Sequence, residues 1–74
     1  MVTKKKKQIG VIGAGAWGTA LSNIIAKKQN VLLWAKEQNV AESINKKHEN
    51  KKFLPHIKLS KKILCTTEIN DLSN

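Results

Sequence analysis

Hydrophobic residues along the chain fall into three short runs, and the longer stretches between them show a helical spacing. The runs cover residues 8–12, 30–35 and 63–66 and contain mainly valine, leucine and isoleucine. Short apolar runs of this kind are typical of strands in a parallel sheet that is covered on both faces. We therefore predict three strands, and we expect the first two to be buried on both faces.

Two helices are predicted between these strands. In residues 16–28 the apolar side chains recur every three or four positions, and two lysines in the last turn complement the helix macrodipole. The apolar side chains that share one face of this helix are Trp17, Ala20, Leu21, Ile24 and Ile25. Residues 37–47 are more polar, with Val40 and Ile44 on the inner side of a second helix.

The other segments are predicted to be irregular, except at the end of the chain. Residues 1–7 form a solvated basic tail, and residues 50–60 form a loop that contains Pro55. Thr67 and Glu68 open a further helix. The order strand, helix, strand, helix, strand implies parallel strands joined by right-handed crossovers, so the fold class is α/β.

Three glycines occupy the turn between the first strand and the first helix. Gly13, Gly15 and Gly18 form the pattern G-x-G-x-x-G, which in this context is typical of a dinucleotide-binding turn. The first glycine permits the tight bend, the second lets the backbone approach a pyrophosphate, and the third lets helix and strand pack closely. The helix N-terminus then offers N–H groups to the phosphates. The pattern predicts the first β-α-β-α-β half of a doubly wound, Rossmann-like sheet, with purely structural glycines as the alternative.

The end of the second strand bears on which dinucleotide is bound. About twenty residues past the glycines, an acid usually bonds the ribose 2′-hydroxyl. This chain has Lys36 there, followed by Glu37. If Lys36 points at the ribose, a 2′-phosphate and hence NADP is favoured, whereas Glu37 in that place favours NAD. Both cofactors stay open at this point.

Length and composition permit one small domain with a packed core. The chain has 74 residues, of which 41% are hydrophobic and 26% are charged, as in globular proteins. Its formal net charge is +9, carried by 14 lysines and no arginine. Such a charge favours weak binding to polyanions, but arginine forks and aromatic stacking platforms are missing. We therefore expect no dedicated nucleic-acid binding.

Cysteine use and hydropathy bear on the compartment. Cys65 is the only cysteine, so there is no disulfide framework and no metal-ligand pair, and the reducing cytoplasm is expected. An alternative interpretation is a signal peptide, with the lysines of residues 4–7 as its positively charged end and residues 9–26 as its apolar segment. Four glycines and several hydroxyl and amide side chains make that segment too polar for membrane insertion.

Four other residues invite a chemical role that the sequence does not support. His48 and His56 lack a ligand or acid-base partner at a suitable spacing, so we assign them to loops or the surface. Cys65 has no flanking basic residue to activate it and is expected in the core. Trp34 is expected to be a core strand residue, not an adenine-stacking one. No metal site is predicted.

Four stretches of the chain resemble one known family. The strings "IGVIGAGAWGTALS", "VLLWAKE", "HENKKFLPHIKL" and "CTTEINDL" look like the N-terminal part of NAD(P)-dependent glycerol-3-phosphate dehydrogenase, in the same order and at similar spacing. The resemblance covers about residues 8–72, nearly the whole chain. The resemblance implies that residues 8–74 are the N-terminal portion of a NAD(P)-binding Rossmann domain, without the helical substrate domain.

The resemblance also implies roles for individual residues. Ala16 and Trp17, which follow the second glycine, contact the cofactor, and Lys36 lies near the adenosine ribose; the alternative for Trp17 is a core position in the helix. Many members have serine at position 16 and a basic residue at 36 or 37, whereas Glu37 is acidic, so preference for the phosphorylated cofactor stays open. The expected cofactor-binding residues are Gly13, Gly15, Ala16, Trp17, Gly18, Lys36 and Glu37.

Members of this family interconvert glycerol 3-phosphate and dihydroxyacetone phosphate, a step that supplies glycerophospholipid precursors. Their catalytic lysines and substrate pocket lie in later parts of the chain, and no residue here matches a catalytic position. This chain is therefore expected to supply the cofactor half and to be inactive alone. A homo-oligomer of the intact enzyme is compatible with the resemblance. Two other hypotheses stay open: a free-standing nucleotide-binding module without catalysis, and a basic nucleic-acid-binding peptide.

Overall fold

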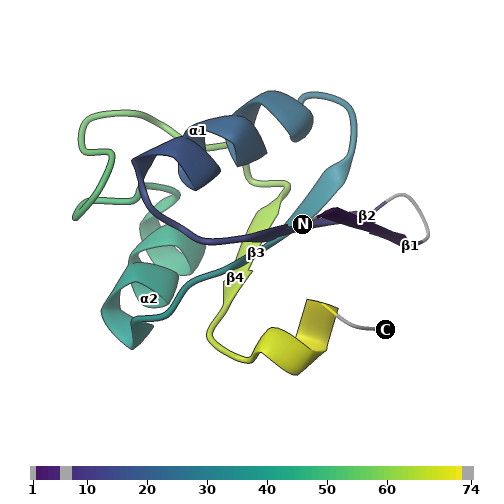
Figure 1. The fold of residues 1–74 in the computed structure, drawn as a ribbon. Coiled ribbons are helices and arrows are strands. Elements are labelled where there is room, and N and C mark those ends of the chain that lie inside the picture. The colour runs from purple at the N-terminus through teal and green to yellow at the C-terminus, as the bar shows by residue number, and fades with distance from the viewer. Residues whose placement is uncertain (1, 6–7, 73–74) are drawn as a thin grey trace.

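The computed structural model describes residues 2–5 and 8–72, which form one four-stranded sheet flanked by helices (Figure 1). The elements are β1 (Val2–Lys5), β2 (Gln8–Ile12), α1 (Ala16–Ile25), β3 (Asn30–Trp34), α2 (Gln38–Lys47), β4 (Ile63–Thr66) and the 3-10 helix η1 (Ile69–Leu72). The three strands and two helices predicted from the hydrophobic pattern are confirmed. The helix predicted to open at Thr67 begins two residues later and is a single 3-10 turn.

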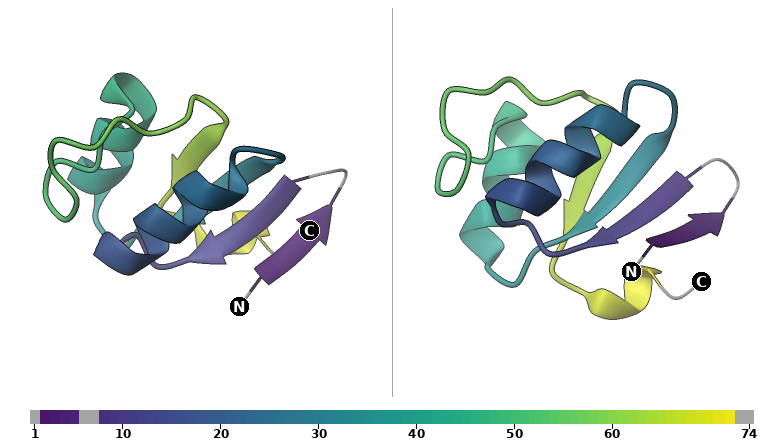
Figure 2. Two further views of the ribbon diagram at one scale, coloured as in Figure 1. Left: turned by 90° about the horizontal axis from the view of Figure 1, so that it is seen from above. Right: turned by 45° about the horizontal axis from the view of Figure 1, so that its top comes forward.

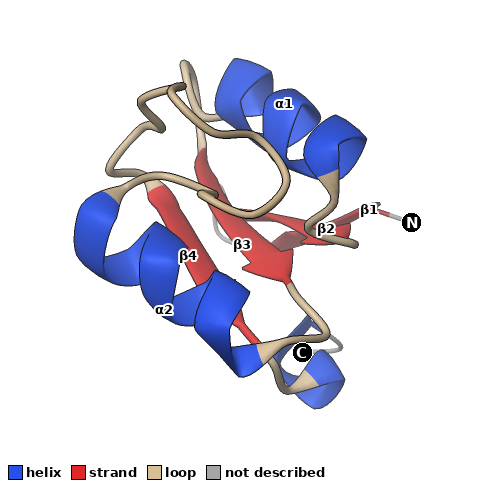
Figure 3. Ribbon diagram, turned by 90° about the vertical axis from the view of Figure 1, so that its left-hand side faces the viewer, coloured by secondary structure: helices blue, strands red, loops and turns tan. Residues whose placement is uncertain are grey.

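β2, β3 and β4 run parallel and follow one another across the sheet in chain order. Ile12 pairs with Trp34, and Trp34 pairs with Thr66, so the carboxyl ends of the three strands meet at one end of the sheet. Both crossovers step in the same direction and crossovers of this kind are right-handed, so α1 and α2 lie over the same face (Figure 3). This arrangement confirms the predicted half of a doubly wound sheet.

Only one face of the parallel strands is fully covered. Val31, Leu33 and Ile63 belong to the core beneath the helices, whereas Leu64 is 57% exposed and Ile12 is 40% exposed. The expectation that the first two strands are buried on both faces is therefore wrong, since Ile12 of β2 is exposed and Leu32 and Trp34 of β3 are only half-buried. Because both helices lie on the same side, η1 is the element of the described residues that packs on the opposite face, against β2 and β3 (Figure 1).

The N-terminal residues also differ from the prediction of a solvated tail. The backbone of Val2–Lys5 forms β1, which pairs antiparallel with β2. Without β1 the outer edge of β2 would present unpaired N–H and C=O groups. Backbone pairing needs no particular side chain, which explains why a lysine-rich segment can supply it. Residues 1, 6 and 7 of the predicted tail lie outside the described residues.

The first helix is shorter than predicted. α1 ends at Ile25, so Lys27 and Lys28 lie in the turn that follows and not in its last turn. Residues 9–26, considered above as a membrane-inserting segment, are divided between β2, the glycine turn and α1. Within the described part of the chain, no helix has the length and hydropathy needed to cross a membrane.

Most of the apolar stripe of α1 faces away from the sheet, although Ile25 packs against the core. Trp17 is 92% exposed, Ile24 is 63% exposed and Leu21 is 46% exposed. The residues that α1 buries completely are Thr19 and Ser22. The alternative that Trp17 is a core residue is therefore wrong.

α2 buries the side that its hydrophobic pattern indicates. Val40, Ala41 and Ile44 are buried in the core against β4, and the helix ends in exposed lysines. His48 ends the helix in the left-handed conformation, with a φ of 56°, and its N–H donates to the carbonyl of Ile44. This helix is held to the sheet by apolar burial and by the two hydrogen bonds between the Asn45 side chain and the backbone of Cys65.

The loop predicted for residues 50–60 is confirmed, and it runs alongside α1 on its way to β4 (Figure 2). The N–H of Ser60 donates to Asn23 Oδ1 of α1 at 2.9 Å, and Leu59 is buried in the core. An isolated bridge pairs Asn50 with Leu54 near its beginning. These contacts give the loop a fixed path past the carboxyl end of the sheet.

Candidate functional site

The site begins at the turn between β2 and α1. Gly13 has a φ of +106°, a conformation that side chains rarely adopt, so the tight bend requires glycine. Its N–H donates a hydrogen bond of 3.0 Å to the carbonyl of Trp34, the last residue of β3. The turn is therefore fixed at the carboxyl end of the sheet, where open α/β folds bind their ligands.

The other two glycines of the pattern serve different purposes. A Cβ at Gly18 would lie 1.8 Å from the carbonyl oxygen of Gly13, so only glycine lets α1 approach the turn this closely. A Cβ at Gly15 would meet nothing within 4 Å. Gly18 is thus required by the packing of the protein itself, whereas the space in front of Gly15 is open to a ligand.

The first turn of α1 is suited to an anion. Gly15 is the N-cap residue and makes no side-chain cap, and this turn contains no acidic residue. Unpaired N–H groups and the positive end of the macrodipole make such a terminus a binding site for phosphate. The turn is formed by Ala16, Trp17 and Gly18, three of the residues that the sequence assigns to cofactor binding.

Asn50 fixes the glycine turn from the loop side. Its side chain is fully buried, and Nδ2 donates to the carbonyl of Ala14 at 2.7 Å and to Thr19 Oγ1 at 2.8 Å. Oδ1 of the same side chain accepts the N–H of Phe53 at 3.1 Å. One amide therefore joins the turn, α1 and the loop in a network that is satisfied at both ends.

The sequence indicates this part of the site only coarsely. The resemblance implies that residues 50–55 order a loop near the cofactor, and it assigns no role to Asn50 itself. Its contact with Ala14 joins residues 36 positions apart. Such a contact has no periodicity that a single sequence could reveal.

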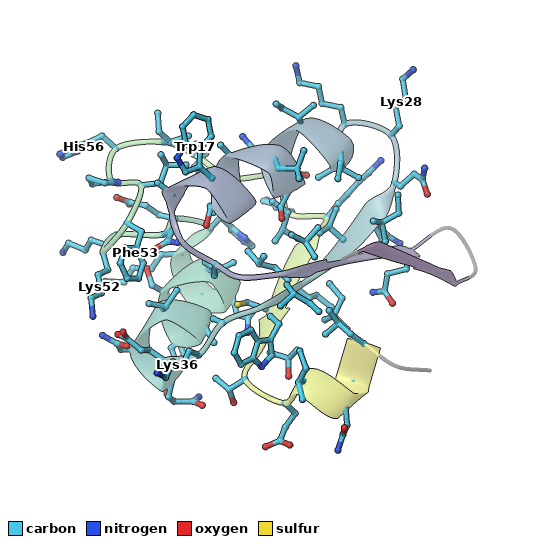
Figure 4. All side chains as sticks on the ribbon, in the orientation of Figure 1. Trp17, Lys28, Lys36, Lys52, Phe53 and His56 are labelled. Carbon is cyan, nitrogen blue, oxygen red and sulfur yellow. The ribbon has the colours of Figure 1, made fainter. Side chains whose placement is uncertain are left out.

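A cavity of about 220 Å³ opens beside the turn. Its lining comes from the turn, the end of β3, the start of α2 and the loop, namely Gly13, Ala14, Gly15, Trp34, Ala35, Lys36, Glu37, Val40 and Phe53. It brings together four predicted cofactor-binding residues: Gly13, Gly15, Lys36 and Glu37. Ala16, Trp17 and Gly18 do not line it, and the Trp17 side chain projects outward from α1 (Figure 4).

One lining residue, Glu37, forms an ion pair at the rim with Lys52 of the loop. Glu37 Oε1 lies 2.6 Å from Lys52 Nζ, and both side chains are roughly half exposed. Lys52 Nζ also lies 5.3 Å from the centre of the Phe53 ring, within the range of a cation–π contact. Because Lys36 and Glu37 both line the cavity, the structure brings the two candidate ribose contacts to the same place.

The residues assigned no chemistry are placed largely as expected. Cys65 is in the core, and burial raises the pKa of its thiol to about 11, so it is protonated and unreactive at neutral pH. His48 ends α2 and His56 is exposed in the loop. Trp34 is half-buried, not a full core residue, and its indole N–H donates to the carbonyl of Thr67 at 3.0 Å. Among the described residues, no three or more His, Cys, Asp or Glu side chains lie close enough together to hold a metal ion.

The geometry fits a dinucleotide. The open backbone at Gly15 and the uncapped start of α1 suit a pyrophosphate, since both present N–H groups without a side chain in the way. The adjoining cavity offers an aromatic ring, a carboxylate and ammonium groups to a nucleoside. Both parts lie at the carboxyl ends of β2 and β3.

Comparison with known proteins points to one family. The family model described as "NAD-dependent glycerol-3-phosphate dehydrogenase N-terminus" matches residues 8–74. Over 67 residues the chain is 55% identical to glycerol-3-phosphate dehydrogenase (NAD(P)+) of Maricaulis maris. These residues make up 89% of this chain and 20% of that protein. The corresponding protein of Carboxydothermus hydrogenoformans is 44% identical over 63 residues, which covers 84% of this chain and 19% of the relative.

Solved structures agree with the sequence comparison. Glycerol-3-phosphate dehydrogenase from Plasmodium falciparum superposes with a TM-score of 0.80 at 25% identity, over 88% of this chain and 21% of that chain. The enzyme from Saccharomyces cerevisiae superposes with a TM-score of 0.78 at 30% identity. The superposition covers 92% of this chain and 23% of the yeast chain. The chain thus spans about one fifth of the length of the curated relatives it matches.

Proposed function

The chain belongs to the family of NAD-dependent glycerol-3-phosphate dehydrogenase N-terminal domains, and on that basis we propose that it binds NAD(H) or NADP(H) for such an enzyme. The observation that carries this proposal is the pairing of Gly18, which the protein needs for its own packing, with Gly15, which leaves open space. A turn that served packing alone would have no use for a second, unobstructed glycine.

The proposal assigns each part of the site a task. The pyrophosphate lies against the open backbone at Gly15, where N–H groups of Ala16 and Trp17 at the start of α1 stabilise its charge. The adenosine ribose lies in the cavity beside Lys36 and Glu37. Asn50 keeps the turn in place by holding the Ala14 carbonyl. All of these residues bind and orient, and none of them is assigned a proton-transfer step.

In the reaction proposed for the whole enzyme, a hydride passes between the carbinol carbon of glycerol 3-phosphate and the nicotinamide, giving or consuming dihydroxyacetone phosphate. The bound cofactor supplies the hydride acceptor or donor. This chain's share is to fix the position of the dinucleotide relative to the substrate, since orientation alone contributes a large part of such catalysis. We further propose that residues 8–74 act together with a substrate-binding domain and that the protein works in the cytoplasm, in keeping with its single unpaired cysteine.

A domain replacement tests the proposal in a working enzyme. Residues 8–74 are substituted for the matching segment of the Maricaulis maris relative, and NAD(P)+-dependent oxidation of glycerol 3-phosphate is measured beside the unmodified enzyme. We expect the chimera to be active, because the replacement segment carries the complete glycine turn and its Asn50 support. A chimera that unfolds cooperatively like the parent enzyme but neither binds cofactor nor oxidises glycerol 3-phosphate would contradict the proposal.

A further inference from the structure

Glu37 at the nucleoside end of the site is already engaged by a residue from another segment. Lys52, which lies in the loop after α2, places its Nζ 2.6 Å from Glu37 Oε1. The two residues are 15 positions apart, so only the fold brings them together. Glu37 is therefore presented to a ligand as half of an ion pair and not as a free carboxylate.

Lys52 is positioned by two residues that line the cavity. Besides the ion pair with Glu37, its Nζ lies 5.3 Å from the centre of the Phe53 ring. Figure 4 shows Lys52, Phe53 and Lys36 on the side of the molecule where α2 and the loop meet, far from Lys28 at the other end of α1. The ammonium group is thus held at the rim where the ribose of the dinucleotide is proposed to lie.

The surroundings of this rim are strongly positive. A second cavity, of about 460 Å³, lies between α2 and the loop and shares Val40 with the first. Four of its lining residues are lysines, against the single carboxylate of Glu42: Lys46, Lys47, Lys51 and Lys52. An additional phosphate at the ribose would therefore meet an attractive potential on the side facing α2.

We propose that Lys52 is the residue that recognises the 2′-phosphate of the dinucleotide and so sets the preference between the phosphorylated and unphosphorylated cofactor. This inference rests on the function proposed above. When a 2′-phosphate is present, Lys52 leaves Glu37 and bonds the phosphate. When the ribose carries a 2′-hydroxyl, the ion pair stays closed and Glu37 accepts the hydroxyl with its second oxygen.

The energetics favour such an exchange. An ion pair between half-exposed side chains contributes little to stability, so little is lost when it opens. A phosphate near neutral pH carries more charge than a carboxylate and has three acceptor oxygens. Lys36, exposed at the end of β3, can bond the same group. The 2′-phosphate therefore competes successfully with Glu37 for Lys52.

The test uses 2′,5′-ADP and 5′-AMP, two ligands that differ only in the 2′-phosphate. Binding of each to the 74-residue chain is measured by titration calorimetry at 0.15 M salt, for the parent and three variants. Lys52→Met removes the proposed phosphate contact, and Glu37→Gln removes its competitor. Lys28→Met, a change of one charge at an exposed position remote from the site, is the matched control.

We expect Lys52→Met to weaken 2′,5′-ADP binding about tenfold while 5′-AMP binding changes by less than about twofold, because a charge-assisted contact is lost for one ligand alone. Glu37→Gln is expected to strengthen 2′,5′-ADP binding relative to 5′-AMP binding, because Lys52 is then free for the phosphate. Lys28→Met is expected to leave the ratio of the two affinities unchanged. Equal effects of Lys52→Met on both ligands, or none on either, would overturn the inference and leave the proposed function standing. A parent chain that is folded but binds neither ligand would refute the proposed function and the inference together.

Discussion

The two helices that cover the sheet have the same length and lie on the same face, yet they bury opposite kinds of surface. α2 packs Val40, Ala41 and Ile44 against the sheet and leaves its lysines exposed. α1 buries Thr19 and Ser22 completely and leaves Trp17, Leu21 and Ile24 exposed, with Ile25 packed against the core. One helix therefore follows the usual amphipathic rule, and the other largely departs from it.

The two helices bury different surfaces because they have different structural roles. α2 stabilises the sheet by removing apolar surface from water. α1 must bring its first turn close to the glycine turn, which only small side chains on its inner face allow, and Thr19 then joins the polar network of Asn50. We infer that α2 supplies stability and that α1 supplies the geometry of the binding site.

Truncation of an apolar residue in each helix gives the largest expected contrast. Ile44→Ala removes a fully buried side chain of α2 and is expected to lower the free energy of unfolding by about 3 kcal/mol. Ile24→Ala removes a side chain of α1 that is 63% exposed, and its expected effect is below about 0.5 kcal/mol. Urea unfolding followed by circular dichroism measures both. A loss for Ile24→Ala as large as that for Ile44→Ala would break the comparison.

Alanine substitutions at Gly15 and Gly18 distinguish a glycine that leaves space for a ligand from one that the packing of the protein requires. Gly18→Ala places a Cβ against a backbone oxygen that cannot move aside, so we expect a loss of about 2 kcal/mol in the free energy of unfolding. Gly15→Ala meets no atom, and its expected effect on unfolding is below about 1 kcal/mol. Thermal unfolding of the two variants side by side is the check, and equal melting temperatures would count against the close approach of α1.

Removal of the Asn50 amide tests whether polar contacts hold α1 in place. Asn50→Ala leaves the Ala14 carbonyl and Thr19 hydroxyl without this donor in a buried site, with an expected loss of about 1–3 kcal/mol. Asn50→Asp keeps the shape but replaces the donor with an acceptor, so it should be at least as damaging. Hydrogen exchange of the glycine turn and of β4 reports the effect. Protection lost at the turn but kept in β4 is expected, and uniform loss would contradict a local role.

A further expected effect concerns pH and the strand beneath α2. Asn45 of α2 bonds both the N–H and the carbonyl of Cys65, whose buried thiol has its pKa raised from 9.0 to about 11. The unfolded chain loses this proton more easily, so stability is full below about pH 9 and falls as the pH rises toward 11. Cys65→Ala lacks this contribution, while all lysines remain. The slope of stability between pH 9 and 11 should be shallower in Cys65→Ala, and parallel slopes would contradict the raised pKa.

The sequence predicted the strands, the helices and the glycine turn because each of these has a local pattern. The runs of valine, leucine and isoleucine match β2, β3 and β4 to within one residue at either end. The roles of Gly13 and Gly18 also follow from local requirements, a positive φ and a close approach, that only glycine meets.

The features that the sequence did not predict depend on contacts between distant segments. The orientation of α1 is set by the small residues that meet the turn, not by its apolar stripe, so periodicity alone gave Trp17 a core position as one alternative. β1 forms through backbone pairing, which lysines neither favour nor prevent. Asn50 and Lys52 reach the site only because the loop folds back past the carboxyl ends of the strands.

The most direct test of the central claim compares cofactor affinity with stability at Gly15. NADH and NADPH are titrated into the 74-residue chain and into Gly15→Ala, with the free energy of unfolding of each chain measured in the same buffer. If the open space at Gly15 is the pyrophosphate site, the variant unfolds within about 1 kcal/mol of the parent but binds at least about tenfold more weakly. Equal affinity of the two chains for both cofactors would contradict the account.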